Sequence, residues 1–351
     1  RGKLNAYSAV VGENGKIILK ASDTTLLEAG STTTATGAGT GGEVQVLGEK
    51  VGLMGDALVD VSGQTGGGTA LIGGDYQGKN AAVMNAEQVY VGKDAVIKAD
   101  AIASGNGGKV IVWGNQTAQA YGSIFARGGA QSGNGGFIET SGNFLDVTGI
   151  RVTASAPKGK TGQWLLDPLD IIVTDEMGPT ANLSDVSAFA ANGDAVTEIF
   201  RGTVSNAIGI SPGTSVILQA KRNITFNGSV NIDAPDIGLT AQAGNDIVVN
   251  AELVTNRGPI VLSANDNSAG TASGSGRVIV NTSNGGSVTS NNGGTVTIRD
   301  SSTNPPPPPP SADICTIAPN SALCQVLSPP TASEPVKPVQ QASNEIIRTV
   351  T

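Results

Sequence analysis

The chain has 351 residues and a formal net charge of −8, with no histidine and only two cysteines. Because no stretch is rich in Lys or Arg, a phosphate backbone would be repelled, so we predict no nucleic-acid partner. Without histidine, and with only two cysteines, the chain lacks most of the side chains from which a catalytic triad or a zinc site is built. We therefore expect neither enzymatic activity nor a metal or cofactor.

Glycine accounts for 49 residues, whereas aromatic residues make up 3% and charged residues 14% of the chain. A core of Val, Ile, Leu and Ala with frequent glycines suits stacked sheets better than a compact globule, which usually relies on aromatic area. No run approaches 18 consecutive apolar residues, so we predict no transmembrane segment. No signal peptide is visible, and we expect that the natural start of the protein has been removed.

Short β-prone runs in the first half of the chain are each preceded by glycine. The glycines directly before these runs are Gly15, Gly42, Gly68, Gly108, Gly136 and Gly162. Their spacings are 27, 26, 40, 28 and 26 residues, and self-similarity at such a period indicates a solenoid, a propeller or a repeat array. We interpret the 40-residue step as a coil that carries an insertion near DYQGKNAAVMNAEQ.

Each period contains three short runs with alternating residue character, for example EVQVLG, KVGLMG and ALVDVSG between Glu43 and Gly63. Such alternation indicates strands, and no regular Asn-Gly hairpin signal separates them, which argues against a propeller. We predict an all-β fold, a right-handed parallel β-helix, over residues 1–174 with coils of about 26–28 residues. The glycines, with Asn106 and Asn134 before two of the glycine pairs, are expected to supply left-handed backbone at the corners.

Residues 175–211 interrupt the repeat. Ser184 is placed as an N-cap before apolar residues with helical spacing, so we expect a short helical excursion that is either a binding surface or a plain connector. From 212 to 300 the β-prone runs return, with an offset of 23 residues between Ile224 and Ile247. We predict that this stretch forms coils of about 21–23 residues in the same solenoid.

Six consecutive prolines change the composition after residue 300. We predict a polyproline linker at 301–310 and a largely disordered tail with a cysteine loop at 311–351. Cys315 and Cys324 lack the partners of a zinc site and the spacing of a redox pair. A structural disulfide in an oxidising compartment is therefore the expected interpretation, with two incidental cysteines as the alternative.

The segment GKTGQWLLDPLDIIV, followed by GTSVILQAKRNITF, resembles the large exoproteins of two-partner secretion, of the filamentous-haemagglutinin and high-molecular-weight adhesin type. The resemblance covers about residues 1–300. Its most specific part is the motif of Trp164, Leu165, Leu166, Asp167 and Pro168. The amino-terminal secretion domain of this family does not occur in the sequence, so the chain resembles the C-terminal part of a longer exoprotein.

This resemblance implies a secreted virulence adhesin at the bacterial cell surface, tethered to the outer membrane. Its implied partners are an outer-membrane β-barrel transporter and a glycan or protein receptor on a host cell or matrix. Cys315 and Cys324 match, by type and loop size, the cysteine pair that retains such adhesins at their transporter. The implied function is a stalk and anchor that mediates attachment and aggregation.

Two other functions stay open at this point. One is a secreted haemolysin or toxin-delivery exoprotein of the same export class, which a separate toxic domain would favour. The other is a β-helical carbohydrate-active enzyme. Its candidate residues would be Asp146, Arg151, Lys158 and Lys160, if they meet on one coil edge.

Two further groups of residues are candidates for a site or a modification. Asp167 and Asp170 flank Pro168 and are either a carboxylate pair for calcium or acid–base chemistry or, in the case of Asp167, a cap on a turn. Asn-x-Ser/Thr sequons, which are candidate glycosylation sites, occur at Asn115, Asn182, Asn223, Asn227 and Asn281.

Overall fold

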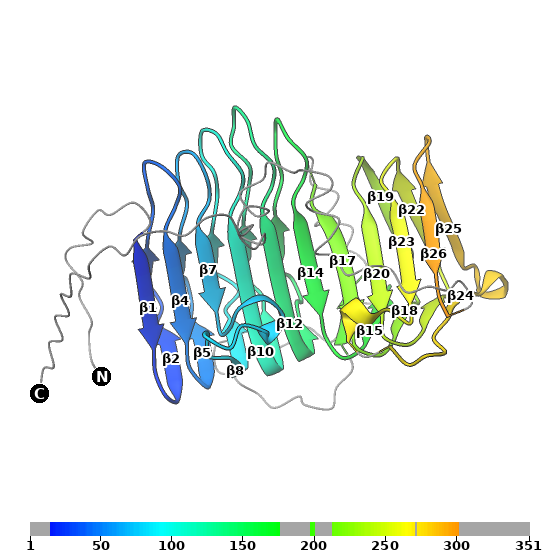
Figure 1. The fold of residues 1–351 in the computed structure, drawn as a ribbon, viewed down its shortest axis with the longest axis horizontal. Helices are drawn as coiled ribbons and strands as arrows, with labels where there is room; N and C mark the ends of the chain where they lie inside the picture. The colour runs from blue at the N-terminus through cyan, green and yellow to red at the C-terminus, as the bar shows by residue number, and fades with distance from the viewer. Residues whose placement is uncertain (1–14, 176–196, 201–212, 271, 302–351) are drawn as a thin grey trace, which may run out of the picture. The chain divides into compact units, whose positions relative to one another are not determined.

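The computed structural model describes residues 15–175, 197–200, 213–270 and 272–301 (Figure 1). The chain divides into two units, Arg1–Pro306 and Pro307–Thr351, and the second unit, with Cys315 and Cys324, lies outside the described residues. In the part that is described, the regular elements are strands and three short 3₁₀ turns: η1 (Tyr76–Gly78), η3 (Asn267–Ala269) and η4 (Thr282–Asn284). No helix in this part is long and apolar enough to cross a membrane.

The described strands form four sheets, of which sheet 1 is the largest, with 13 strands. Its main path contains β1 (Lys16–Lys20), β4 (Glu43–Leu47), β7 (Thr69–Ile72), β10 (Lys109–Ala120), β12 (Phe137–Asp146), β14 (Gln163–Asp167), β17 (Ser215–Ala220), β20 (Leu239–Ala243), β23 (Ile260–Ala264) and β26 (Val296–Arg299). Three further strands pair beside this path, β2 (Thr24–Leu27), β5 (Lys50–Leu53) and β8 (Ala86–Val91), the last against the second half of β10.

The remaining sheets close the coils on the other sides. Sheet 2 contains β3 (Thr32–Thr34), β6 (Leu58–Asp60), β9 (Val96–Lys98), β11 (Ser123–Phe125) and β13 (Arg151–Thr153). Sheet 3 contains β15 (Ile171–Thr174), β16 (Thr197–Phe200), β18 (Ile224–Phe226), β21 (Ile247–Val249) and β24 (Val278–Val280). Sheet 4 contains β19 (Val230–Pro235), β22 (Glu252–Asn256) and β25 (Ser287–Asn291).

Strand pairing is parallel throughout these sheets, and successive strands of sheet 1 lie side by side in Figure 1. The register places equivalent residues of successive coils next to one another, as with Val44 beside Ala70 and Ile138 beside Trp164. These inward side chains are fully buried in one continuous core. The prediction of an all-β fold with parallel sheets is therefore confirmed, and the arrangement is consistent with a β-helix.

The glycine pairs lie where neighbouring coils touch backbone to backbone. A Cβ on Gly68 would collide with the carbonyl oxygen of Gly42, and a Cβ on Gly108 would collide with that of Gly68. The first glycine of each pair is equally confined, since a Cβ on Gly67 would meet the carbonyl oxygen of Ala99. The φ angles of these glycines lie outside the left-handed region. The expectation of left-handed backbone at the pairs was therefore wrong, because close approach between coils is what requires glycine.

The left-handed residues are one position earlier than expected. Gly105 and Gly133 have φ values of 88° and 112°, and each precedes an asparagine with no positive φ. The asparagines instead bind the next coil: Asn106 Oδ1 accepts the N–H of Asn134 at 2.8 Å, and Asn134 Oδ1 accepts the N–H of Lys160 at 2.9 Å. Each residue type in Ser-Gly-Asn-Gly-Gly therefore has its own role. The first glycine adopts the left-handed backbone of the turn, and the asparagine accepts a hydrogen bond from the next coil. The final two glycines allow the backbones of neighbouring coils to approach closely.

The predicted insertion is a closed loop over the outer face of sheet 1. It leaves at Gly73 and returns at Ala86, whose N–H donates to the carbonyl of Gly73 at 2.6 Å. The loop covers Trp113, whose ring would collide with a Cβ on Gly74 or Gly78. It completes a second apolar cluster outside the coils, made of Leu47, Leu71, Val83, Ile111 and Trp113.

The stack changes its cross-section after β15. Sheet 2 ends at β13 within the described residues, and β16, a strand that the sequence analysis did not predict, pairs in parallel with β15. Two buried threonines connect the strands after β15 to the coils before it. Thr197 Oγ1 accepts the N–H of Leu145 at 3.0 Å, and Thr214 Oγ1 accepts the N–H of Ala154 at 2.8 Å. The predicted helical excursion, including Ser184, falls on residues outside those described.

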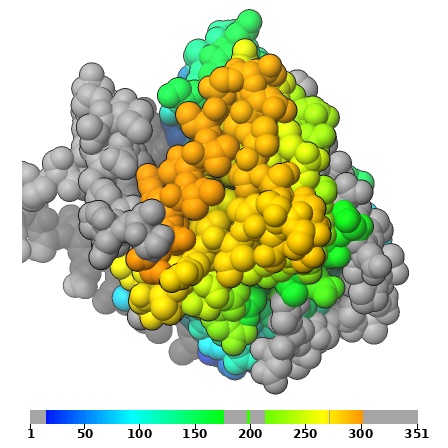
Figure 2. Space-filling model, turned by 90° about the vertical axis from the view of Figure 1, so that its right-hand side faces the viewer, coloured from blue at the N-terminus to red at the C-terminus, as the bar shows by residue number. Residues whose placement is uncertain are grey.

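The later coils have different lengths. The register offset is 23 residues from Val216 to Leu239 and 21 from Leu239 to Ile260, but 36 from Ile260 to Val296, because η3 and η4 lie in the last coil. Figure 2 shows the end of the stack that this coil forms. Its apolar side chains are partly exposed, with 41% for Val296 and 44% for Ile298, since no described strand pairs with the outer edge of β26.

Candidate functional site

The Trp164–Pro168 motif forms β14 and the turn after it. Trp164 is fully buried in the inward column of sheet 1, and its Nε1–H donates to Thr140 Oγ1 at 3.0 Å. Leu166 is also directed into the core, whereas Leu165 and Asp167 lie on the outer face and are buried there. The motif therefore contributes packing to the core and one acidic group to the outer face.

Asp167 lies near a second buried carboxyl group, Glu139 on β12. Glu139 is 0% exposed and Asp167 is 5% exposed. In the register, Glu139 lies between Ile111 and Leu165, and Asp167 lies beside Ser141. Burial raises the pKa of Glu139 to about 8, and the charge of Asp167 adds to that rise. Burial also raises the pKa of Asp167 to about 7.

The insertion loop covers this carboxyl pair. The backbone N–H of Gln77 donates to Glu139 Oε1 at 3.1 Å, and the Gln77 side chain donates to Gln219 Oε1 on β17. The ring of Tyr76 packs edge-on against that of Phe137, with 5.7 Å between the ring centroids. Burial, together with the charges of Glu139 and Asp167, raises the pKa of the Tyr76 hydroxyl to about 12. Carboxyls with shifted pKa values often mark catalytic sites, but neither of these is open to a substrate. The pair is suited to holding the loop in a pH-dependent way.

The two aspartates of the motif region have different surroundings. Asp167 Oδ1 is buried without a hydrogen-bond partner, so the interpretation of Asp167 as the cap of a turn is not supported. Asp170 makes contacts between coils: its Oδ1 accepts the N–H of Asn223 at 3.0 Å, and its Oδ2 binds the guanidinium of Arg222. Asp170 therefore fastens its own coil to the following one. The carboxylate partner of Asp167 is Glu139, which the sequence analysis did not single out.

The four candidates for a carbohydrate-active site do not form a group in the structure. Asp146 accepts from the Tyr121 hydroxyl at 2.8 Å and from the N–H of Thr148 at 3.0 Å, which are structural contacts. Burial and Asp146 raise the pKa of Tyr121. Arg151, Lys158 and Lys160 are exposed, and no ion pair joins any of these four residues to another.

Most of the sequon amides in the described residues are engaged in hydrogen bonds. Asn115 donates to Glu87, Asn223 to Asp170 and Asn281 to Asn250. Asn227 accepts a bond from Asn250 through Oδ1 and donates none through Nδ2, and it is exposed. Asn182 lies outside the described residues. Within the described ranges, no set of three Asp, Glu, Cys or His side chains lies close enough together to hold a metal ion.

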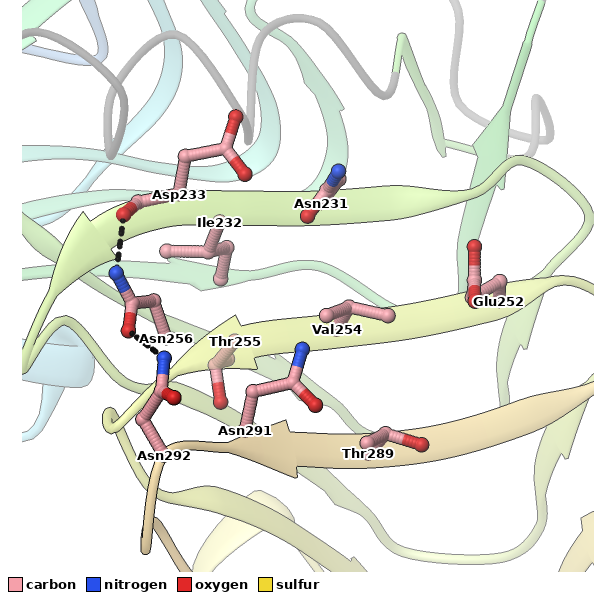
Figure 3. Close-up of a pocket in the computed structure, with 10 residues that line it drawn as sticks. All are labelled: Asn231, Ile232, Asp233, Glu252, Val254, Thr255, Asn256, Thr289, Asn291 and Asn292. Carbon is pink, nitrogen blue, oxygen red and sulfur yellow. Dashed lines mark hydrogen bonds between the residues drawn. The ribbon is translucent and has the colours of Figure 1, made fainter.

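A polar pocket of about 440 Å³ lies on the outer face of sheet 4 (Figure 3). We call it the sheet-4 pocket. It is lined by Asn231, Ile232, Asp233, Glu252, Val254, Thr255, Asn256, Thr289, Asn291 and Asn292. All of them belong to β19, β22 and β25 or directly follow these strands. The sheet register sets Asn231, Val254 and Thr289 side by side, and it sets Asn256 beside Asn291.

Two amides of the sheet-4 pocket are held in place, whereas most of its other polar groups are unpaired. Asn256 Nδ2 donates to the carbonyl of Asp233 at 2.8 Å, and Asn292 Nδ2 donates to Asn256 Oδ1 at 2.9 Å (Figure 3). The polar side chains of the pocket without such a bond are Asn231, Asp233, Glu252, Thr289 and Asn291. The pocket therefore presents hydrogen-bonding groups on a rigid sheet.

No protein-family model matches this chain, and no curated protein is significantly similar to it. The resemblance to two-partner secretion exoproteins therefore rests on the segments quoted above. Sequence reasoning missed Glu139 because its burial depends on a loop 62 residues earlier. A detectable signal was present, since Glu139 replaces an apolar residue in a row that contains Leu71, Ile111 and Leu165.

Proposed function

We propose that this chain is the stalk and surface-anchoring part of a large secreted bacterial adhesin, exported by two-partner secretion and mediating attachment and aggregation. The observation that carries the proposal is the parallel pairing of ten successive strands in sheet 1, from Lys16 to Arg299. A fold in which each coil contacts its neighbours gains length coil by coil. Such growth gives a secreted protein reach from the cell surface.

The proposal includes three finer features. The coils wind as a right-handed β-helix, as parallel crossovers generally do. Cys315 and Cys324 form a disulfide loop in the tail, which keeps the protein at an outer-membrane β-barrel transporter. Residues 1–300, which form the proposed stalk, contain no cysteine. No disulfide can therefore form within the stalk before export, which supports passage through a pore in the unfolded state.

The proposal is tested in the bacterium that secretes the protein. Replacing Cys315→Ser should move the protein from the cell surface into the medium, because the tether needs the closed loop. The circular dichroism of the released protein should be unchanged. Ser321→Ala, which alters the same loop but keeps both thiols, is the control and should leave the protein on the cells. Retention of the Cys315→Ser protein would contradict the anchoring role.

A further inference from the structure

The sheet-4 pocket has the composition of a site for a neutral, hydroxyl-rich ligand. Four of its ten lining residues are asparagines, and two threonines and two carboxylates supply further polar groups. A carboxamide both donates and accepts hydrogen bonds, as each sugar hydroxyl does. The volume of about 440 Å³ lies within the usual range for small-ligand sites. We propose that this pocket binds a neutral oligosaccharide, which would make it a receptor site of the proposed adhesin.

Charge excludes the anionic ligands. The lining contains Asp233 and Glu252 and no Lys or Arg, so phosphate, sulfated glycans and sialylated glycans would meet only negative charge. A single metal ion is also excluded by geometry. Glu252 lies four residues before Asn256 on β22, about 13 Å away at the rise of a parallel strand, and Asp233 is at the Asn256 end. Figure 3 shows the two carboxylates at opposite ends of the pocket.

The pocket also offers apolar contact on a sheet whose inner face is packed in the core. Val254 lies between Asn231 and Thr289 in the centre of the face, half-buried, where it offers a surface to the C–H side of a sugar ring. The inward residues of the same strands, Ile232 and Leu253, are buried in the core and hold the sheet in place. A preformed surface loses little conformational entropy on binding, which favours weak ligands such as neutral sugars.

The test uses the full chain and calorimetric titration with four probes. These are chitotetraose, cellotetraose, a heparin-derived tetrasaccharide and tetralysine. One or both neutral sugars should bind, with an affinity that changes less than about twofold between about 0.05 and 0.5 M salt, since no ionic contact is made. The double variant Asn231→Ala/Asn291→Ala should weaken this binding at least about tenfold, as expected for the loss of two sets of hydrogen bonds.

Two further variants separate the alternatives. Asp233→Asn/Glu252→Gln removes both charges but keeps hydrogen-bonding groups, so binding of the neutral sugar should stay within about fivefold. Thr297→Ala, an outward residue on β26 in the same coil region, is the control and should bind like the unaltered chain. Circular dichroism of every variant should match that of the unaltered chain.

Three outcomes of the titration would contradict sugar binding by the sheet-4 pocket. The proposal is overturned if no neutral sugar binds, if only tetralysine or the heparin fragment binds, or if the asparagine variants bind sugar normally. Because the inference rests on the proposed adhesin function, the titration is compared with the retention experiment on Cys315→Ser. Normal surface retention of the protein without sugar binding would overturn the pocket alone, whereas retention of the Cys315→Ser protein would overturn the anchor.

Discussion

The backbone N–H of Gln77 donates to the carboxylate of Glu139 at 3.1 Å, although the two residues are 62 positions apart. The contact joins the insertion loop to the outer face of a later coil. It also helps to bury Glu139 and Asp167, and burial favours the protonated form of each carboxyl group.

Stability should fall as pH rises. In the folded state the pKa of Glu139 is raised from 4.5 to about 8 and that of Asp167 from 3.8 to about 7. The folded chain therefore binds more protons than the unfolded chain between about pH 4 and 8, so the free energy of unfolding decreases across that window. Tyr76 and Lys79 from the loop, Lys109 on β10 and Lys221 after β17 are the other titratable groups acting on the pair.

The measurement is the melting temperature between pH 5 and 9. We expect a decrease of at least about 2 °C, since 1 kcal/mol corresponds to about 2–4 °C in proteins of 150–250 residues. Glu139→Gln with Asp167→Asn should flatten the profile. Glu28→Gln, on the exposed surface, should not. An identical slope in the double variant and the unaltered chain would assign the pH dependence to other groups.

Contact between coils should make the second glycine of each pair intolerant of any side chain. Gly108→Ala forces a Cβ onto the carbonyl oxygen of Gly68, and we expect a loss of stability of about 1–3 kcal/mol, the typical range for overpacked cores. Gly39→Ala has open space around the new Cβ and should change stability by less than about 0.5 kcal/mol. Chemical denaturation of both variants provides the comparison. Equal tolerance at the two positions would show that the coils are less tightly apposed than described.

The Asp170 carboxylate should stabilise the junction between two coils. Its side chain is 13% exposed and accepts from the N–H of Asn223. Asp170→Ala should therefore cost about 1–3 kcal/mol, because a partly buried donor loses its acceptor. In the exposed Lys93–Asp94 pair the Asp94 side chain is 59% exposed, so Asp94→Ala should cost less than about 1 kcal/mol. Equilibrium unfolding in urea distinguishes the two. A small effect at both sites would mean that Arg222 and Asn223 find other partners.

Sequon use should follow the hydrogen bonds of the asparagine amides. If the producing cell glycosylates Asn-x-Ser/Thr sites after folding, Asn227 should carry the sugar, because its Nδ2 makes no bond and the side chain is exposed. Asn115, Asn223 and Asn281 should remain unmodified, since each donates its amide to a neighbour. Peptide mass analysis of the secreted protein measures this directly. Modification at Asn223 or Asn281 instead would indicate that the sugar is added before folding.

The regular part of the fold could be predicted because it is local. The glycine spacing and the alternation of the short runs determine the coil length, and the register of Glu43 with Thr69 matches the 26-residue step. The cause of the glycine requirement could not be predicted, because it depends on a carbonyl oxygen one coil away. Glu139 and β16 were missed for a similar reason, because each depends on a segment that is distant in the sequence. The burial of Glu139 depends on the insertion loop around Gln77, and β16 forms only by pairing with β15.

The candidate site was predicted less completely than the fold. The sequence singled out Asp167 and Asp170 together because they are neighbours along the chain. In the structure Asp167 lies near Glu139 on the outer face of sheet 1, whereas Asp170 accepts the N–H of Asn223 on the following coil. The sheet-4 pocket is formed by residues at intervals of about one coil, such as Asn231, Val254 and Thr289. None of these residues is unusual in its own segment, and only the stacking brings them together.

The change of cross-section between β15 and β17 also has an evolutionary consequence. Within the first block, duplicating or losing one full turn keeps every strand in register, as the equivalence of Glu43 and Thr69 illustrates. A duplication that crosses from Thr174 to Gly213 would instead place a sheet-2 strand against sheet-3 neighbours. Related genes should therefore vary in the number of turns on either side of this junction, and the junction itself should be inherited as a single piece.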